Sequence, residues 1–136
     1  MEGKKFFCNY AMLIDDSGID NFIHEKQLKT SRFARTIEVF VNAEEALRVL
    51  AREKQLPDYI FLDIHMPFKD GFEFLDELGV QPDKFKAIKI VILTASAHPI
   101  DRLRAESYPQ ITAYFDKPLD QKHLLELKMN TVKQKI

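Results

Sequence analysis

The sequence has little of what would indicate secretion or membrane insertion. Its only cysteine is Cys8, so an intrachain disulfide is impossible, and a lone thiol fits a reducing compartment. No apolar run approaches the roughly 18 residues that a membrane-spanning helix needs. The apolar stretch near the start is interrupted by Asn9 and ends at Asp15, without the small-residue cleavage site of a signal peptide. We therefore expect a cytoplasmic protein with no membrane partner.

An excess of charge of one sign is also missing. The 136 residues carry 20 Lys and Arg against 21 Asp and Glu, which gives a formal net charge of −1. Nucleic-acid binding usually needs a clustered basic face, whereas these basic residues are spread along the chain with mild enrichment after Gln121. We interpret that enrichment as the solvated side of a terminal helix, so no nucleic-acid partner is expected.

The chain lacks internal repeats, low-complexity tracts and linkers, which predicts a single domain over residues 1–136. Short apolar runs alternate with segments of helical periodicity. Strands are predicted at about 8–14, 36–41, 58–62, 89–93 and 112–115. Helices are predicted at 19–29, between the N-cap Asn42 and Pro57, at 71–78, at 100–106 and from Asp120 onward. This alternation predicts an α/β fold whose parallel sheet is covered by helices on both faces.

Four of these helices show apolar residues at helical spacing, which in the second are Ala43, Ala46, Leu47 and Leu50 and in the third Phe72, Leu75 and Leu78. The first carries Ile19, Phe22 and Ile23 on one side. The terminal helix repeats Leu125, Met129, Val132 and Ile136 at i, i+4, i+7 and i+11, which is typical of an amphipathic helix. Residues 79–86 show no such pattern and are predicted to form an irregular loop.

Polar side chains follow four of the predicted strands, at the points where the strands end. Asp15 and Asp16 follow the first strand, Asp63 the third, Thr94 the fourth and Lys117 the fifth. Ligands of open α/β sheets bind outside the carboxyl ends of the strands, so these side chains are expected to form one site.

The composition of that site indicates its chemistry. Three neighbouring carboxylates repel one another unless a cation lies between them, and all-oxygen ligands with water suit Mg²⁺ better than zinc or copper. A lysine and a hydroxyl add donors for the oxygens of a phosphoryl group. Together these groups are typical of phosphoryl transfer, in which positioning and charge neutralisation supply most of the catalysis.

The same residues resemble a known family when they are taken in order. The matching motifs are Asp15-Asp16, the stretch 63–71 with Met66-Pro67 and Asp70-Gly71, Thr94-Ala95, and Lys117-Pro118. The chain resembles the receiver domain of two-component response regulators, of the CheY-like, stand-alone type. The resemblance covers the whole chain and implies a doubly wound, flavodoxin-like sheet with strand order 2-1-3-4-5.

The resemblance implies a role for each acidic residue. Asp63 would be the phosphoacceptor, whose carboxylate attacks a phosphohistidine to give an acyl phosphate. Asp16 and Asp63 would hold Mg²⁺ directly, and Asp15 would act through water. The backbone carbonyl of His65 would be a further metal ligand.

It also implies roles for the remaining motifs. Lys117 would bind the incoming phosphoryl oxygens, and the Lys117-Pro118 bond would be cis and would turn the lysine toward the pocket. Thr94 would donate its hydroxyl to the phosphoryl group after transfer, with the backbone N–H of Ala95 as a third donor. Tyr114 would be the switch aromatic, which turns inward as Thr94 moves.

Each of these residues also has a plainer interpretation. Asp15 and Asp16 would complement the dipole of the following helix. Thr94 would simply end a strand, and Lys117 would be a surface lysine before a turn proline. Tyr114 would be an ordinary core aromatic.

The other residues near these motifs are given lesser roles. Asp70-Gly71 is interpreted as a turn and helix start, and Met66-Pro67 as shaping the loop after the third strand. The imidazole of His65 is a poor ligand for Mg²⁺, which prefers oxygen, and is instead expected to tune the hydrolysis of the acyl phosphate. His24, His98 and His123 have no partners at ligand spacing and are predicted to lie at the surface.

The leading functional hypothesis is a phosphorylation-dependent switch, not a separate enzyme, that catalyses only its own phosphorylation and slow hydrolysis. Its phosphodonor would be a histidine kinase or histidine phosphotransfer protein. We expect no output domain after the terminal helix, so an unidentified downstream protein would bind the surface of this domain. By resemblance that surface is the fourth helix, fifth strand and fifth helix, roughly 100–135, in a monomer or weak dimer.

Two alternatives stay open. A phosphatase of the haloacid dehalogenase type also uses a strand-end Asp with Mg²⁺, Thr and Lys. However, it needs a second Asp two residues later, where this chain has His65. A degenerate receiver would act only as a binding module, which loss of Asp63, Lys117 or the acidic pair would have favoured.

Overall fold

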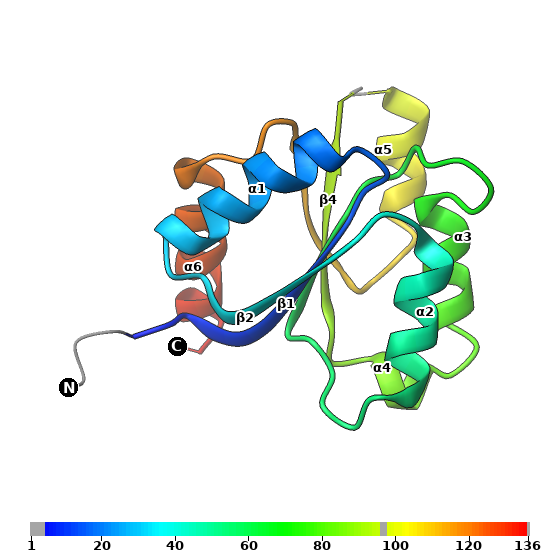
Figure 1. Cartoon of the computed structure of the whole chain (residues 1–136), viewed down its shortest axis with the longest axis horizontal. Coiled ribbons are helices and arrows are strands. Elements are labelled where there is room, and N and C mark those ends of the chain that lie inside the picture. Colours follow the sequence, from blue (N-terminus) through cyan, green and yellow to red (C-terminus); the bar gives the residue numbers. More distant parts are fainter. Residues whose placement is uncertain (1–4, 96–97, 136) are drawn as a thin grey trace.

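The strands and helices follow the predicted alternation. A computed structural model describes residues 5–95 and 98–135. Within them the strands are β1 (Cys8–Ile14), β2 (Ala34–Phe40), β3 (Tyr59–Leu62), β4 (Lys89–Thr94) and β5 (Ile111–Asp116). The helices are α1 (Gly18–Thr30), α2 (Ala43–Arg52), α3 (Gly71–Leu78), α4 (Pro82–Phe85), α5 (Pro99–Ala105) and α6 (Gln121–Lys135). The strands form one sheet in the order β2-β1-β3-β4-β5, and every pairing is parallel, as predicted (Figure 1).

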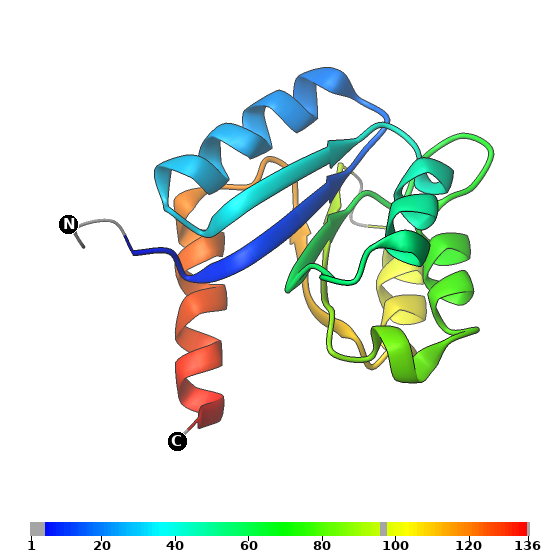
Figure 2. The same ribbon diagram turned by 60° about the horizontal axis from the view of Figure 1, so that its bottom comes forward.

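Helices cover both faces of the sheet, as the α/β pattern predicts. Figure 2 shows α1 and α6 on one face and α2, α3, α4 and α5 on the other. Successive side chains of a strand point to opposite faces, so a strand covered on both sides is apolar throughout. In β1, Met12 and Ile14 join the core under α2 and α3, while Ala11 and Leu13 join the core under α1 and α6. All four are 0% exposed.

Side-chain caps fix where three of the helices begin. The side chain of Asn42 accepts a hydrogen bond from the backbone of Glu45, which confirms Asn42 as the N-cap of α2. Asp70 and Glu73 form a reciprocal capping box, which confirms Asp70-Gly71 as a helix start. Ser17 caps α1 in the same way. No helix among the described residues is both long and apolar enough to span a membrane.

The stretch predicted to be an irregular loop contains a short helix. Residues 79–86 include α4, which has Pro82 at its first position. Proline fits the first turn of a helix because its ring fixes φ and the missing N–H would have no helical partner there. Phe85 is 5% exposed and packs into the core beneath α2 and α3, so one buried aromatic ring gives this connection its structure.

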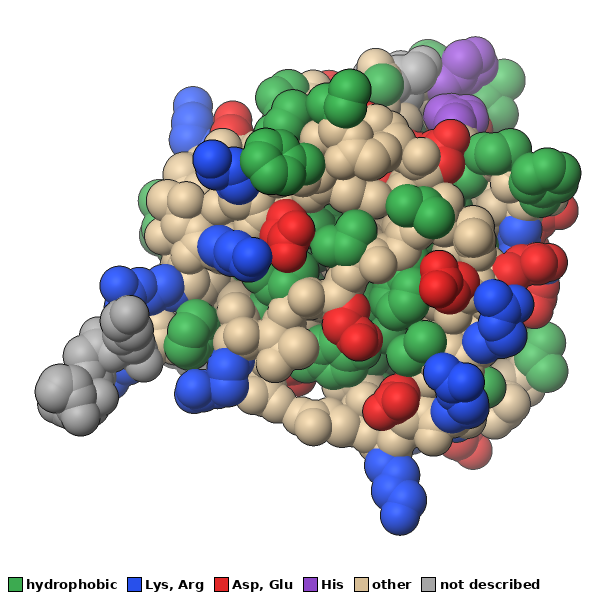
Figure 3. Space-filling view, in the orientation of Figure 1, with side chains coloured by type: hydrophobic (Ala, Val, Ile, Leu, Met, Phe, Trp, Pro, Cys, Tyr) green, Lys and Arg blue, Asp and Glu red, His purple; other side chains and the backbone are tan. Residues whose placement is uncertain are grey.

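The apolar sides named for α1 and α6 do not face the core. On α1, Ile19 is 75% and Phe22 62% exposed, and hydrophobic side chains reach the surface along this helix in Figure 3. The buried residues of α1 are Asn21, His24 and Leu28. In the part of α6 whose side chains the structure describes, residues 121–130, Leu124 and Leu127 are buried while Leu125 and Met129 are exposed; Val132 and Ile136 lie outside that part. Periodicity identified both helices correctly, but not which side of each is buried.

Candidate functional site

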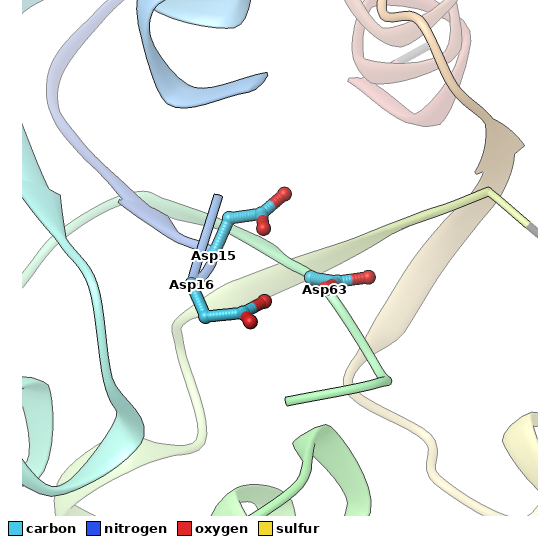
Figure 4. Close-up of side chains that lie close together, drawn as sticks. All are labelled: Asp15, Asp16 and Asp63. Carbon is cyan, nitrogen blue, oxygen red and sulfur yellow. The ribbon is translucent and has the colours of Figure 1, made fainter. Parts of the chain in front are cut away.

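Three carboxylates meet at the carboxyl ends of β1 and β3. Oxygen atoms of Asp15, Asp16 and Asp63 all lie within 4.8 Å of one another (Figure 4). Asp15 and Asp63 are buried, at 3% and 6% exposure, whereas Asp16 is exposed. The backbone N–H of Asp63 donates to the carbonyl of Ile14 at 3.0 Å, so the parallel pairing of the two strands brings these residues together. The predicted convergence at this edge of the sheet is confirmed.

Burial and crowding make the Asp63 carboxylate unusual. Removal from water, followed by the nearby charge of Asp15, raises the pKa of Asp63 from 3.8 to about 6. The ammonium of Lys117 acts in the opposite direction but does not cancel this rise. The ionised cluster is therefore costly by itself, and a cation held by the three carboxylates would relieve that cost.

Lys117 supplies the positive charge of the site. Its Nζ lies 2.7 Å from Oδ2 of Asp15, 2.8 Å from Oδ2 of Asp20 and 3.7 Å from Oδ1 of Asp63. Burial acts to lower the pKa of Lys117, but the hydrogen bonds to Asp15 and Asp20 and the charge of Asp63 outweigh it and raise that pKa. The Lys117–Pro118 peptide bond is cis, as predicted. Lys117 is therefore a half-buried, fully charged partner of the acidic cluster and not a surface lysine.

Thr94 and Ala95 lie beside Lys117 at the end of β4. The backbone N–H of Lys117 donates to the carbonyl of Thr94 at 2.8 Å, which joins the end of β4 to the segment after β5. Thr94 is 0% exposed, and Ala95 is exposed. The structure thus places both residues at the same edge as the carboxylates, where the sequence predicts them.

Tyr114 lies in β5 and is partly buried. Its ring lies under the guanidinium of Arg102 from α5, at 5.0 Å from the ring centroid. The hydroxyl is buried without a hydrogen-bond partner among the described residues, and burial raises its pKa. Tyr114 is paired in the sheet with Ile92, two residues before Thr94. It therefore lies between the site and α5, and its switch role stays a prediction.

The imidazole of His65 is turned toward α5. Its Nε2 lies 2.9 Å from Oδ2 of Asp101, in the first turn of that helix. The side chain of His65 is 58% exposed and that of Asp101 is 20% exposed. A side-chain contact thus connects the loop after Asp63 to α5. The sequence did not indicate this contact, because the two residues are far apart in the chain.

The surface prediction for the three other histidines holds for His98 alone. His24 is 1% exposed, and burial lowers its pKa, with a further effect from Lys117. It is buried because it lies on the side of α1 that faces the sheet. His123 is half-buried and its ring stacks on Phe115 with centroids 4.2 Å apart. His98 is exposed.

Asp20 is the site residue that sequence reasoning missed. It belongs to the first turn of α1, and its carboxylate reaches Lys117, 97 residues later in the chain. Residues three and four apart lie on one side of a helix, so the helical start after Asp16 was a signal that Asp20 would lie near the acidic pair. Asn21 was missed as well, and its side-chain amide donates to the backbone carbonyl of Asp15 at 2.9 Å.

The donor set fits a hard divalent cation. Three carboxylates meet, two of them buried, whereas the ammonium of Lys117 brings a single positive charge. Oxygen ligands of this kind suit Mg²⁺, which keeps several waters and takes few protein carboxylates. The cluster could therefore hold Mg²⁺ through the residues predicted for it.

Comparisons with known proteins agree with this arrangement. A family model described as response regulator receiver domain matches residues 11–128. The chain is 31% identical over 133 residues to the sensor histidine kinase CheAY of Helicobacter pylori, covering 97% of this chain but only 16% of that protein. It is 30% identical to the response regulator Rcp1 of Synechocystis, covering 85% of this chain and 81% of that protein.

Solved structures show the same architecture. A two-component response regulator from Cytophaga hutchinsonii superposes with a TM-score of 0.80 at 28% identity, covering 93% of this chain and 97% of that one. A response regulator receiver protein from Dyadobacter fermentans gives a TM-score of 0.79 at 29% identity, with the same coverage.

Proposed function

The chain belongs to the response regulator receiver domain family and so acts in phosphorylation-dependent two-component signalling; from this premise we propose that Asp63 is its phosphoacceptor. The observation that carries this proposal is the position of Asp63. It is a buried carboxylate that follows β3, with two acidic neighbours close by and with Lys117 Nζ 3.7 Å from its Oδ1. An anionic phosphoryl group brought to Asp63 therefore meets a cation-binding cluster and an ammonium together.

In the proposed reaction, a carboxylate oxygen of Asp63 attacks the phosphorus of a phosphohistidine. An O–P bond forms to Asp63 as the N–P bond breaks, and the leaving imidazole nitrogen keeps the electron pair. Mg²⁺, when bound by Asp15, Asp16, Asp63 and the backbone carbonyl of His65, would neutralise negative charge on the phosphoryl oxygens. The ammonium of Lys117 would bind the same oxygens and hold the group in line.

After transfer, Thr94 and Ala95 would donate hydrogen bonds to the phosphoryl group on Asp63. The Thr94 hydroxyl and the Ala95 backbone N–H lie at the end of β4, beside the strand that carries Asp63, and would donate to phosphoryl oxygens. Tyr114 is two residues from Thr94 across the β4–β5 pairing and would move with it. The phosphorylated state would then be a second conformation, which a partner selects.

The phosphodonor would be a histidine kinase or a histidine phosphotransfer protein. The signal would leave through α5, β5 and α6, the surface predicted at roughly 100–135. The structure has a hollow of about 460 Å³ there, lined by residues that include Arg102, Tyr114 and Glu126. A partner that binds only the phosphorylated form would contact this surface, and the protein is proposed to be a monomer or weak dimer.

The direct test uses a small phosphodonor. Incubation of the full chain with Mg²⁺ and acetyl phosphate should add the mass of one phosphoryl group, which Asp63→Asn should not gain. Asp83→Asn, at an exposed aspartate in α4, is the matched control and should be phosphorylated like the unmodified chain. No mass gain in the unmodified chain would favour the degenerate receiver instead. An equal gain in Asp63→Asn would show that another residue accepts the group.

The downstream partner can be sought with a phosphate mimic. Pull-downs with and without beryllofluoride should recover a protein that binds only the mimic-bound form. Substitutions in α5 or α6, such as Arg102→Ala, should weaken that capture without changing phosphorylation. Capture that does not depend on the mimic would contradict the proposed switch.

A further inference from the structure

Lys117 is held by an acidic residue outside the predicted site. The ammonium has three donors. Two of them are at hydrogen-bond distance from carboxylates, Asp15 Oδ2 at 2.7 Å and Asp20 Oδ2 at 2.8 Å. Asp63 Oδ1, at 3.7 Å, is beyond hydrogen-bond distance. The lysine is therefore drawn toward the start of α1 and away from the residue that accepts the phosphoryl group.

We propose that Asp20 is a positioning residue that competes with the phosphoryl group for Lys117 and so slows phosphorylation of Asp63. This inference rests on the proposed function of Asp63 and Lys117. Phosphoryl oxygens on Asp63 need a donor from the ammonium, and Asp20 already occupies one of the three. Because Lys117 Nζ lies 2.8 Å from Asp20 but 3.7 Å from Asp63, a phosphoryl group on Asp63 would compete with Asp20 for the position of the ammonium.

The charge of the pocket acts in the same direction. Four carboxylates, those of Asp15, Asp16, Asp20 and Asp63, lie around one ammonium. A divalent cation would still leave the pocket with an excess of negative charge, which repels an anionic phosphodonor. Loss of the Asp20 charge would reduce that repulsion and release one donor of Lys117.

Asp20 is not needed to hold α1 in place through its side chain. The cap of the helix is a hydrogen bond from the backbone N–H of Asp20 to the Oγ of Ser17, at 3.1 Å. An asparagine at position 20 keeps that backbone donor. The side chain of Asp20 is 35% exposed, so its ion pair with Lys117 has the modest strength of a partly solvated pair. Asp20→Asn should therefore change the ammonium's partners and leave the fold intact.

The test measures phosphorylation rate against phosphodonor concentration in the full chain with Mg²⁺ and acetyl phosphate. Asp20→Asn should raise the apparent second-order rate constant by about two- to fivefold, the range that a partly exposed ion pair allows. The affinity for beryllofluoride should rise by a similar factor. Asp20→Glu restores a carboxylate partner for the ammonium and should return both values toward those of the unmodified chain.

Two further variants separate this effect from general charge and from the proposed function. Glu25→Gln removes one negative charge from the same helix at a residue paired with Lys29, and it should leave the rate unchanged. An equal rise in Glu25→Gln, or an unchanged or slower rate in Asp20→Asn, would overturn the role of Asp20. Phosphorylation of Asp63→Asn would overturn the proposed function itself, because the acceptor would then be a different residue.

Discussion

The substitution Asp63→Asn should stabilise the metal-free protein at neutral pH. Burial and the charge of Asp15 raise the pKa of Asp63 from 3.8 to about 6. A pKa change of this size corresponds to a free energy of up to about 3 kcal/mol, by which the ionised carboxylate destabilises the folded state. Asparagine has nearly the same shape and no charge. We therefore expect the variant to unfold with a free energy higher by about 1–3 kcal/mol.

The size of this stabilisation depends on pH. Below pH 3.8 the carboxyl group is protonated in both folded and unfolded chains, so its ionisation makes no difference to stability. Between pH 3.8 and about 6 the folded chain keeps a proton that the unfolded chain has released, so this contribution to stability falls as pH rises. Above about pH 6 the carboxylate is ionised in both states, and the folded state is destabilised by the full amount. The advantage of Asp63→Asn should thus be largest at pH 7–8 and small near pH 4.

Urea unfolding with a chelator present, followed by far-UV circular dichroism at pH 4, 6 and 7.5, measures this difference. Asp83→Asn is the control and should change the free energy of unfolding by about 0.5 kcal/mol or less. Saturating Mg²⁺ should stabilise the unmodified chain more than Asp63→Asn, because the cation binds the folded cluster. Equal or lower stability of Asp63→Asn at pH 7.5 without metal would refute the view that this carboxylate is held at a cost.

Three other predictions concern the surroundings of the site. Gly71→Ala should lower the free energy of unfolding in urea by about 1–3 kcal/mol, because a Cβ there would lie 2.8 Å from the carbonyl oxygen of Asp63. Gly18→Ala is the control and should have little effect, because a Cβ at position 18 would meet nothing within 4 Å. The buried, neutral His24 should make the protein less stable as pH falls below 6.5, because the unfolded chain binds its proton more readily; His24→Asn should lose that part of the pH dependence in thermal unfolding. A double-mutant cycle of His65→Ala and Asp101→Asn should give a coupling of about 0.2–1 kcal/mol, and zero coupling would show that the contact is not formed in solution.

The strand-end site was predictable because it follows from the geometry of parallel sheets. Each apolar run is a buried strand, all parallel strands end at one edge, and the polar residue after each run must lie there. Asp15, Asp63, Thr94 and Lys117 were therefore located from the sequence by counting strands. Their exact contacts, such as the 3.7 Å between Lys117 and Asp63, depend on packing that no local pattern encodes.

The buried sides of the helices were less predictable for a physical reason. α1 begins at the polar edge of the sheet, so its inner side meets the backbone and carboxylates of the site and carries Asn21 and His24 there. An argument based on hydrophobicity assigns such residues to solvent, and Ile19 and Phe22 to the core. Asp20 was missed by the same logic, since a carboxylate in the first turn of a helix also fits the helix dipole.

Two neighbouring residues of α5, Asp101 and Arg102, contact the loop after Asp63 and strand β5. Asp101 receives the imidazole of His65 from the loop after Asp63, and Arg102 covers the ring of Tyr114 in β5. Two adjacent side chains of this short helix, Asp101 in its first turn and Arg102 in its last, thus contact two different parts of the protein. A shift of the loop would reach α5 through Asp101, and the proposed inward turn of Tyr114 would reach it through Arg102. The helix would therefore sense the loop and the tyrosine independently, each through its own side chain.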